Sequence, residues 1–149
     1  GGGGVLAQDE TAQALRRELL PAATLITPNA SEARALTGLA DADAAGAALV
    51  AEGCANVLVT GGDEAGETVI NTWHRRDGTP QRFEWPREPV GFHGAGCTLA
   101  SAIAARLAQG DALEQALVRA QRFVQGALAA RLVIGSGRAI PNRWHGARQ

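Results

Sequence analysis

The sequence contains no tyrosine and no methionine, and aromatic residues make up only 4% of its 149 residues. Its two cysteines, Cys54 and Cys97, are too few for a disulfide framework, so we expect a reducing compartment, the cytoplasm. The formal net charge is −1, and no cluster of basic residues favours a nucleic-acid or membrane partner. No apolar run is long enough to span a bilayer. These absences favour an ordinary globular domain, for which the 46% hydrophobic content suffices.

The most informative stretch is a run of small residues, 91–108, which begins as a glycine-rich turn and is expected to become a helix from Thr98 onward. Gly94 and Gly96 permit positive φ and the close approach of a ligand. A turn of this kind directs free N–H groups and the positive end of the helix dipole at one spot, which favours a bound phosphate and the thiolate of Cys97. The alternative is an ordinary loop-to-helix junction with a buried cysteine, because a lone Gly-x-Gly is weak evidence.

A second candidate follows a short run of β-favouring residues, 24–27, which is predicted to be a buried strand. Asn29 and Glu32 lie at its carboxyl end, where a helix over about 31–36 begins. Their spacing is typical of a capping box. The alternative is a ligand site at a strand end, with the carboxylate of Glu32 holding Mg²⁺ directly or through water.

The next elements predict a parallel pair of strands joined through a helix. A helix capped by Asp41 or Asp43 is expected to run to Glu52, and a buried strand follows at 56–60. Gly61-Gly62 makes the turn after this strand, so Thr60 also falls at a carboxyl end.

After that turn the pattern changes to two β-rich runs, 68–74 and 81–85, around the turn signal Asp77-Gly78. These runs predict an antiparallel hairpin at an edge of the sheet, with His74 as a solvated strand residue. A last amphipathic helix is expected from Asp111 or Ala112 to Leu132, and the residues from Pro141 to His145 are expected to form a tail.

The motifs and their order resemble one family. The resemblance of this chain to that family rests on four segments: Thr27-Pro-Asn-x-x-Glu32, Val57-Leu-Val-Thr-Gly-Gly62, His93-Gly-Ala-Gly-Cys-Thr-Leu-Ala-Ser-Ala-Ile-Ala-Ala105 and Gly135-Ser-Gly-Arg-Ala-Ile-Pro141. Together they look like hydroxymethylpyrimidine/phosphomethylpyrimidine kinase, the thiamin-biosynthesis kinase of the ribokinase-like superfamily. Most sugar kinases of that superfamily carry Asp where this chain has Cys97.

The resemblance implies an α/β fold: a ribokinase-like three-layer α/β/α arrangement with a mainly parallel sheet and an antiparallel edge hairpin at about residues 67–85. It also implies that residues 1–149 are the C-terminal part of a single kinase domain, with the N-terminal part missing. Gly1–Gly4 then corresponds to a glycine-containing loop of the family. A homodimer is the assembly expected of the full-length protein.

The implied activity is ATP-dependent phosphorylation of 4-amino-5-hydroxymethyl-2-methylpyrimidine and of its monophosphate. The family's roles carry over to the matching positions. Cys97 would be the catalytic base, in an anion hole made by the backbone of Gly94, Ala95, Gly96 and Cys97. Asn29 and Glu32 would hold the metal, Mg²⁺ or Mn²⁺, and the ATP phosphates, and the nucleotide phosphates would run along Thr60, Gly61 and Gly62.

One departure concerns the segment Thr60-Gly-Gly-Asp63, where family members often carry Lys-Gly-Gly-His. It removes a cation from the phosphate site. Three alternatives to this kinase stay open: a related vitamin kinase for pyridoxal, a nucleotide-binding fragment without turnover, and an α/β domain with no phosphate site.

Overall fold

The computed structural model describes residues 9–146, so the expectation for Gly1–Gly4 lies outside the described residues. The chain divides into two compact units with the boundary between Arg87 and Glu88. We call them the N-terminal unit and the C-terminal unit and describe each by itself. In the N-terminal unit the elements are α1 (Asp9–Ala14), the π-helical η1 (Leu15–Leu19), the 3₁₀ turn η2 (Leu20–Ala22), α2 (Ala30–Thr37), α3 (Ala42–Ala51), β1 (Asn56–Thr60), β2 (Thr68–Arg75) and β3 (Gln81–Pro86).

Helices α2 and α3 begin and end at the signals that the sequence carries. The side chain of Asp41 accepts a hydrogen bond from the N–H of Ala44 at 2.7 Å and so caps α3. Helix α2 ends at Gly38, whose φ of 75° lies in the left-handed region that favours glycine. The predictions of both helices are confirmed.

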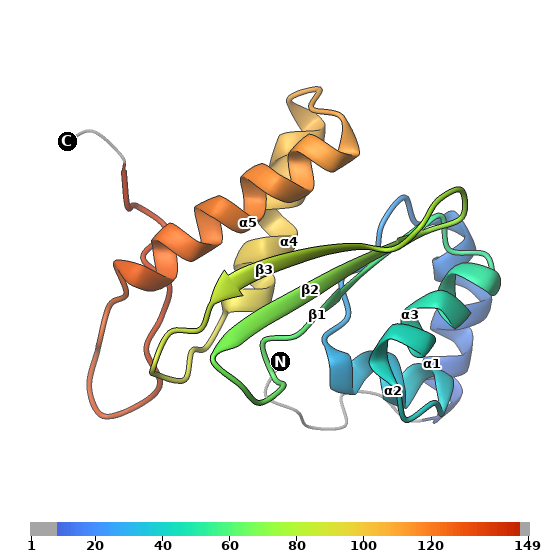
Figure 1. Cartoon of the computed structure of the whole chain (residues 1–149), viewed down its shortest axis with the longest axis horizontal. Helices are drawn as coiled ribbons and strands as arrows, with labels where there is room; N and C mark the ends of the chain where they lie inside the picture. Colours follow the sequence, from blue (N-terminus) through green and yellow to red (C-terminus); the bar gives the residue numbers. More distant parts are fainter. Residues whose placement is uncertain (1–8, 147–149) are drawn as a thin grey trace. The chain divides into compact units, whose positions relative to one another are not determined.

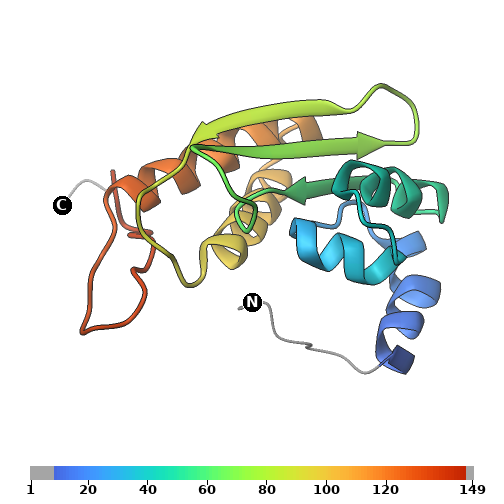
Figure 2. The same cartoon turned by 60° about the horizontal axis from the view of Figure 1, so that its bottom comes forward.

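The core of the N-terminal unit lies where α2 and α3 meet β1 (Figures 1 and 2). Small residues of the two helices let them approach closely, and larger apolar side chains fill the remaining space. The buried members of this cluster are Leu20, Ala30, Ala33, Ala45, Leu49, Cys54, Val57 and Val59.

The sheet is three-stranded, and its strands lie in the order β1-β2-β3 with both pairings antiparallel. The predicted hairpin is confirmed as β2 and β3, in which Val69 pairs with Trp85 and Asn71 with Phe83. The prediction of a mainly parallel sheet is wrong for the described residues, because β1 pairs with the hairpin in antiparallel register.

Parallel pairing is limited to two isolated bridges, Ile26 with Val57 and Asn29 with Thr60. Residues 24–27 form no strand, so that prediction is also wrong. Pro28 gives the physical reason: its carbonyl accepts a hydrogen bond from the N–H of Thr60 at 2.9 Å, but proline has no N–H with which to continue a ladder.

His74 is not the solvated residue that the sequence predicts. Its side chain is only 3% exposed, and neither ring nitrogen has a hydrogen-bond partner within residues 9–146. The ring packs against Gly46 of α3, where a Cβ would collide with it. The alternation of β2 turns this side chain toward α3, which a reading of the strand alone cannot reveal.

In the C-terminal unit, α4 (Ala95–Ala108) packs against α5 (Leu113–Ala129). The contact buries Leu99 and Ile103 of α4 and Leu117 of α5. Helix α4 begins at Ala95 rather than at Thr98, so Gly96 and Cys97 belong to its first turn. No helix in the described part of the chain is long and apolar enough to cross a membrane.

Candidate functional site

The N-terminus of α4 is open. Gly94 is its N-cap with φ of 86°, and no side chain forms a capping hydrogen bond there. The first intrahelical bond runs from the N–H of Thr98 to the carbonyl oxygen of Gly94 at 2.9 Å. The N–H groups of residues 95–97 therefore have no helical partner, and the described residues supply no other acceptor for them. They point outward together with the positive end of the helix dipole, which suits an anion.

Cys97 lies in this first turn and is exposed. The buried cysteine of the alternative is therefore wrong. A Cβ at Gly96 would meet no atom within 4 Å, so the space beside the turn is free.

The turn before α4 is held by the chain's C-terminal segment. Phe92 and Ala139 form a parallel bridge, in which the N–H of His93 donates to Ala139 at 2.9 Å and the N–H of Ala139 donates to Gly91 at 3.1 Å. These bonds fix the path of the backbone into Gly94 without using the N–H groups of the first helical turn.

A cation lies beside this N-terminus. The Nε of Arg143 donates to the Oγ1 of Thr98 at 3.0 Å, and that hydroxyl donates to the carbonyl of Gly94 at 2.7 Å. The Nη2 of Arg143 lies 3.0 Å from the point that a Cβ at Gly94 would occupy. Sequence reasoning missed this residue, because the contact links positions 45 residues apart and no local sequence pattern indicates such a contact.

The N-terminus of α2, by contrast, is filled by the protein's own side chains. Asn29 Oδ1 accepts from the N–H of Glu32 at 2.7 Å, and Glu32 Oε2 accepts from the N–H of Asn29 at 2.9 Å. This is the capping box that the sequence predicts. The carboxylate of Asp63 accepts from the two remaining N–H groups, of Ala30 at 3.3 Å and of Ser31 at 3.0 Å.

Asp63 is held as an anion by this arrangement. Partial burial alone would raise the pKa of its carboxyl group, but hydrogen bonds from the Ser31 hydroxyl and from the N–H groups of Ser31 and Ala30 lower it further than burial raises it. The net result is a pKa below the usual range. The first turn of α2 is therefore neutralised by an internal carboxylate and offers no free N–H group to a phosphate.

The loop after β1 is also tied down. The N–H of Gly61 donates to the Oδ1 of Asn71 at 3.1 Å, and a Cβ at Gly61 would collide with the carbonyl oxygen of Ile70. The guanidinium of Arg87 donates to the carbonyls of Gly61, Gly62 and Gly66 at 3.1, 2.9 and 2.6 Å. Arg87 therefore holds this loop in place.

The predicted metal ligand, Glu32, is exposed, and one of its two carboxylate oxygens serves the capping box. Within residues 9–146 no group of three or more His, Cys, Asp or Glu side chains could hold a metal ion. Mg²⁺ is commonly held by one or two carboxylates, with water and substrate phosphates as its other ligands. The single free oxygen of Glu32 fits that kind of site.

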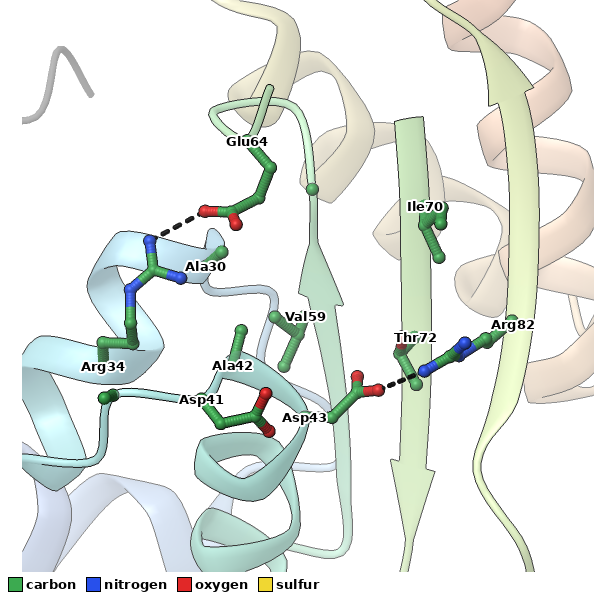
Figure 3. A pocket seen from close by; sticks show the side chains of 12 residues that line it. Ala30, Arg34, Asp41, Ala42, Asp43, Val59, Glu64, Ile70, Thr72 and Arg82 are labelled. Carbon is green, nitrogen blue, oxygen red and sulfur yellow. Dashed lines mark hydrogen bonds and ion pairs between the residues drawn. The ribbon is translucent and has the colours of Figure 1, made fainter. Parts of the chain in front are cut away.

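A pocket of about 300 Å³ lies on the N-terminal unit, between the first turns of α2 and α3 and the sheet (Figure 3). Two ion pairs flank it: Arg34 with Glu64 at 2.7 Å and Arg82 with Asp43 at 2.6 Å. Its arginines are therefore neutralised by carboxylates of the protein. It includes Gly61 but none of the other predicted site residues.

The structure thus brings some predicted residues together within each unit. In the N-terminal unit, Asn29 and Thr60 are bridge partners, and Asn29 and Glu32 share the capping box. In the C-terminal unit, the residues from Gly94 to Cys97 form one continuous N-terminus.

A sequence model described as phosphomethylpyrimidine kinase matches residues 1–142. The chain is 36% identical over 152 aligned residues to the hydroxymethylpyrimidine/phosphomethylpyrimidine kinase of Haemophilus influenzae, covering 96% of this chain and 56% of that protein. The corresponding kinase of Rhizobium meliloti is 38% identical, with 96% and 57% covered. The chain therefore spans about half the length of these curated relatives.

Solved structures of similar fold include a Bacillus subtilis pyridoxal kinase in complex with ADP, with a TM-score of 0.88 and 30% identity, covering 97% of this chain and 57% of that one. A pyridoxal kinase from Staphylococcus aureus in complex with AMP-PCP gives a TM-score of 0.87 and 26% identity, with 95% and 54% covered. The α/β elements described above thus match about half of a ribokinase-like kinase.

Proposed function

Because the chain belongs to the phosphomethylpyrimidine kinase family, we propose that it takes part in ATP-dependent phosphorylation of 4-amino-5-hydroxymethyl-2-methylpyrimidine and of its monophosphate, in thiamin diphosphate biosynthesis. The observation that carries the proposal is the open N-terminus of α4, formed by the segment that the family motif marks. We further propose that the two units belong to a ribokinase-like three-layer domain.

In this proposal the transferred phosphoryl group lies at the N–H groups of Ala95, Gly96 and Cys97. The substrate oxygen forms a bond to the γ-phosphorus of ATP, and the bond from that phosphorus to the β,γ-bridging oxygen breaks, which leaves ADP. The substrate's proton passes to the thiolate of Cys97. Backbone N–H groups at a helix N-terminus stabilise the negative charge that spreads over the phosphoryl oxygens in the transition state.

The roles proposed in the N-terminal unit depend on side chains rather than on backbone N–H groups. Glu32 would hold Mg²⁺ through its free carboxylate oxygen, and the ion would neutralise charge on the ATP phosphates. Asn29 keeps Glu32 in position through the capping box. Thr60, with Gly61 and Gly62, would line the nucleotide path, where the N–H of Gly61 is already bonded to Asn71.

A pyridoxal-type vitamin kinase is the second candidate. It is supported by the similarity to solved pyridoxal kinases, whereas the sequence relatives are named as pyrimidine kinases. Both candidates use the same phosphoryl chemistry and differ in the acceptor alcohol. A panel of acceptors therefore separates them.

The test is to incubate the chain with MgATP and, in separate reactions, the hydroxymethyl pyrimidine, its monophosphate and pyridoxal. Phosphorylated products are measured by mass spectrometry, with Cys97→Ala as the matched variant. Product from a pyrimidine in the parent chain and little in the variant supports the proposal.

Product from pyridoxal alone favours the second candidate. Equal product from parent and variant contradicts the role of Cys97 as base. A chain that MgATP stabilises against heat but that makes no product acts as a nucleotide-binding protein without turnover, because a ligand bound by the native state raises its stability.

A further inference from the structure

Arg143 is the feature of the C-terminal unit that the family match does not reach, since that match ends at residue 142. Its guanidinium bonds to Thr98, inside the first turn and a half of α4, and its Nη2 faces Gly94. Residues 9–146 offer this side chain no carboxylate partner. A cation without a counter-ion therefore lies at the positive end of a helix.

This placement is imposed by the surrounding chain. The N–H of Asn142 donates to the carbonyl of Ala127 on α5 at 2.9 Å. On the other side of Arg143, the ring of His145 lies 4.8 Å from that of Phe123, centroid to centroid, and packs against Gly126. The predicted tail is thus anchored to α5 on both sides of Arg143, and the anchoring presents the guanidinium to α4.

Three other arginines of this unit are paired or lie at the far end of α4. The sequence contains no lysine, so a cation of fixed charge can only be an arginine or a terminus. Arg119 pairs with Asp111 at 2.7 Å, and Arg131 pairs with Glu88 at 3.1 Å. Arg106 lies in the last turn of α4, at the opposite end of the helix.

Electrostatics explain what the arrangement is suited to. A positive side chain near a helix N-terminus is unfavourable by itself, because the helix end carries partial positive charge. A bound, doubly charged phosphoryl group makes the position of the arginine favourable, because it accepts hydrogen bonds from the backbone N–H groups and from the guanidinium together. Arg143 keeps its Nη groups for such a ligand, because its bond to Thr98 uses Nε.

We infer that Arg143 binds the phosphoryl group at the N-terminus of α4 and supplies positive charge there. Thr98 is its positioning residue, since its hydroxyl ties Nε of Arg143 to the carbonyl of Gly94. The inference rests on the proposed function, because it concerns the same phosphoryl site.

The experiment measures the affinity of the whole chain for inorganic phosphate by calorimetry at constant ionic strength, and KM and kcat where the chain turns over. The variants are Arg143→Gln, Arg143→Lys and Thr98→Val. Arg122→Gln is the matched control, because Arg122 is an exposed arginine of α5 and its loss changes the net charge equally.

We expect Arg143→Gln to weaken phosphate binding by about tenfold to a hundredfold, as the loss of a charge-assisted contact does. Arg143→Lys should recover part of that loss, Thr98→Val should show a smaller loss, and Arg122→Gln should bind as the parent does. The melting temperature of Arg143→Gln without phosphate should not fall, which separates ligand binding from a structural role.

Equal phosphate affinity in the parent chain and Arg143→Gln overturns the inference and leaves the proposed function standing. A fall in melting temperature with unchanged affinity also overturns it, in favour of a structural role. If the parent chain neither binds phosphate nor turns over, both the inference and the proposed function fail.

Discussion

Two helix N-termini of this chain, those of α2 and α4, have opposite chemistry. At α2, acceptors from Asn29, Glu32 and Asp63 satisfy the N–H groups of the first turn. At α4, the N-cap is Gly94, which has no side chain to act as acceptor, and the cation of Arg143 lies beside it. The first arrangement stabilises a helix, and the second leaves a place for an anion.

The difference shows that a motif's position at a helix start does not tell whether its N–H groups are free. Both starts follow a turn and both belong to segments that resemble a kinase motif. What separates them is Asp63, which comes from a loop 32 residues along the chain from Ser31. Most of the predictions below add or remove a single acceptor or charge at one of these two helix N-termini.

The largest effect is expected from giving α4 a carboxylate of its own. In Gly94→Asp the new carboxylate would lie at the first turn of α4, as that of Asp63 does at α2, and would pair with Arg143. We expect kinase activity to fall by about a hundredfold or more, the scale for losing an oxyanion-hole donor. Product formation under saturating MgATP measures it.

Gly94→Asn is the matched control, because it has the same shape without the charge, and asparagine tolerates the left-handed backbone at least as well as aspartate does. It should retain clearly more activity than Gly94→Asp. Equal losses in both variants would mean that backbone strain at φ of 86°, and not an occupied anion site, is responsible.

A smaller effect is expected at Glu32, where the side chain caps the helix and is proposed to hold Mg²⁺. Glu32→Gln keeps the capping box, since glutamine also serves at this position, but removes the charge. We expect stability to change by less than about 0.5 kcal/mol, while the Mg²⁺ concentration for half-maximal activity rises by about tenfold, the usual scale for weakening a metal site.

Thermal unfolding and a Mg²⁺ titration of activity measure the two quantities. An unchanged Mg²⁺ requirement would leave Glu32 a capping residue only. A large loss of stability would show instead that the glutamine does not preserve the cap.

Asp63→Ala removes the internal carboxylate from α2 and should lower stability by about 1 kcal/mol at pH 7, as the loss of a helix cap does. Because the pKa of Asp63 is lowered on folding, its contribution is complete above the unfolded pKa and is lost as the pH falls through the folded pKa. Parent and variant should therefore converge in acid. Urea unfolding between pH 7 and pH 3 checks this, and a constant difference would contradict it.

The last prediction concerns His74, whose effect appears only at acid pH. Burial lowers its pKa most, the nearby Asp43 raises it, and Arg82 lowers it, with a net fall below 6.5. The folded state therefore binds this proton less readily than the unfolded state, and stability should fall as the pH drops below about 6.5, by up to about 1.4 kcal/mol per pH unit.

In His74→Leu that share of the pH dependence should disappear, whatever the variant's stability at pH 7. The slope of unfolding free energy between pH 6.5 and pH 5 is the measurement. An identical slope in parent and variant would show that His74 stays neutral, or takes up its proton equally, in both states.

Local signals predicted much of the fold. The caps at Asn29 and Asp41, the terminating Gly38 and the Asp77-Gly78 hairpin each act within a few residues, and the structure confirms each of them. Strand pairing could not be predicted in this way, because β1 pairs both through parallel bridges with residues 26 and 29 and in antiparallel register with β2. Pro28 limits the first, and the eight-residue β2 supplies the second.

The candidate site likewise has a part that local sequence predicts and a part that it does not. The glycine turn and the first turn of α4 are contiguous in sequence, so the motif predicts their location. Three hydrogen bonds of the site depend on the tertiary fold. They join Asp63 to the first turn of α2, Gly61 to Asn71, and Arg143 to Thr98. The burial of His74 against Gly46 likewise depends on a helix that is distant in sequence.

The central claim is that α4, and not α2, presents free N–H groups to phosphate. It is tested most directly by titrating the isotope-labelled chain with inorganic phosphate and following the backbone amide resonances. We predict saturable shifts at Ala95, Gly96 and Cys97 and none at Ala30 and Ser31. Shifts at Ala30 and Ser31 with none in the first turn of α4 would contradict the account.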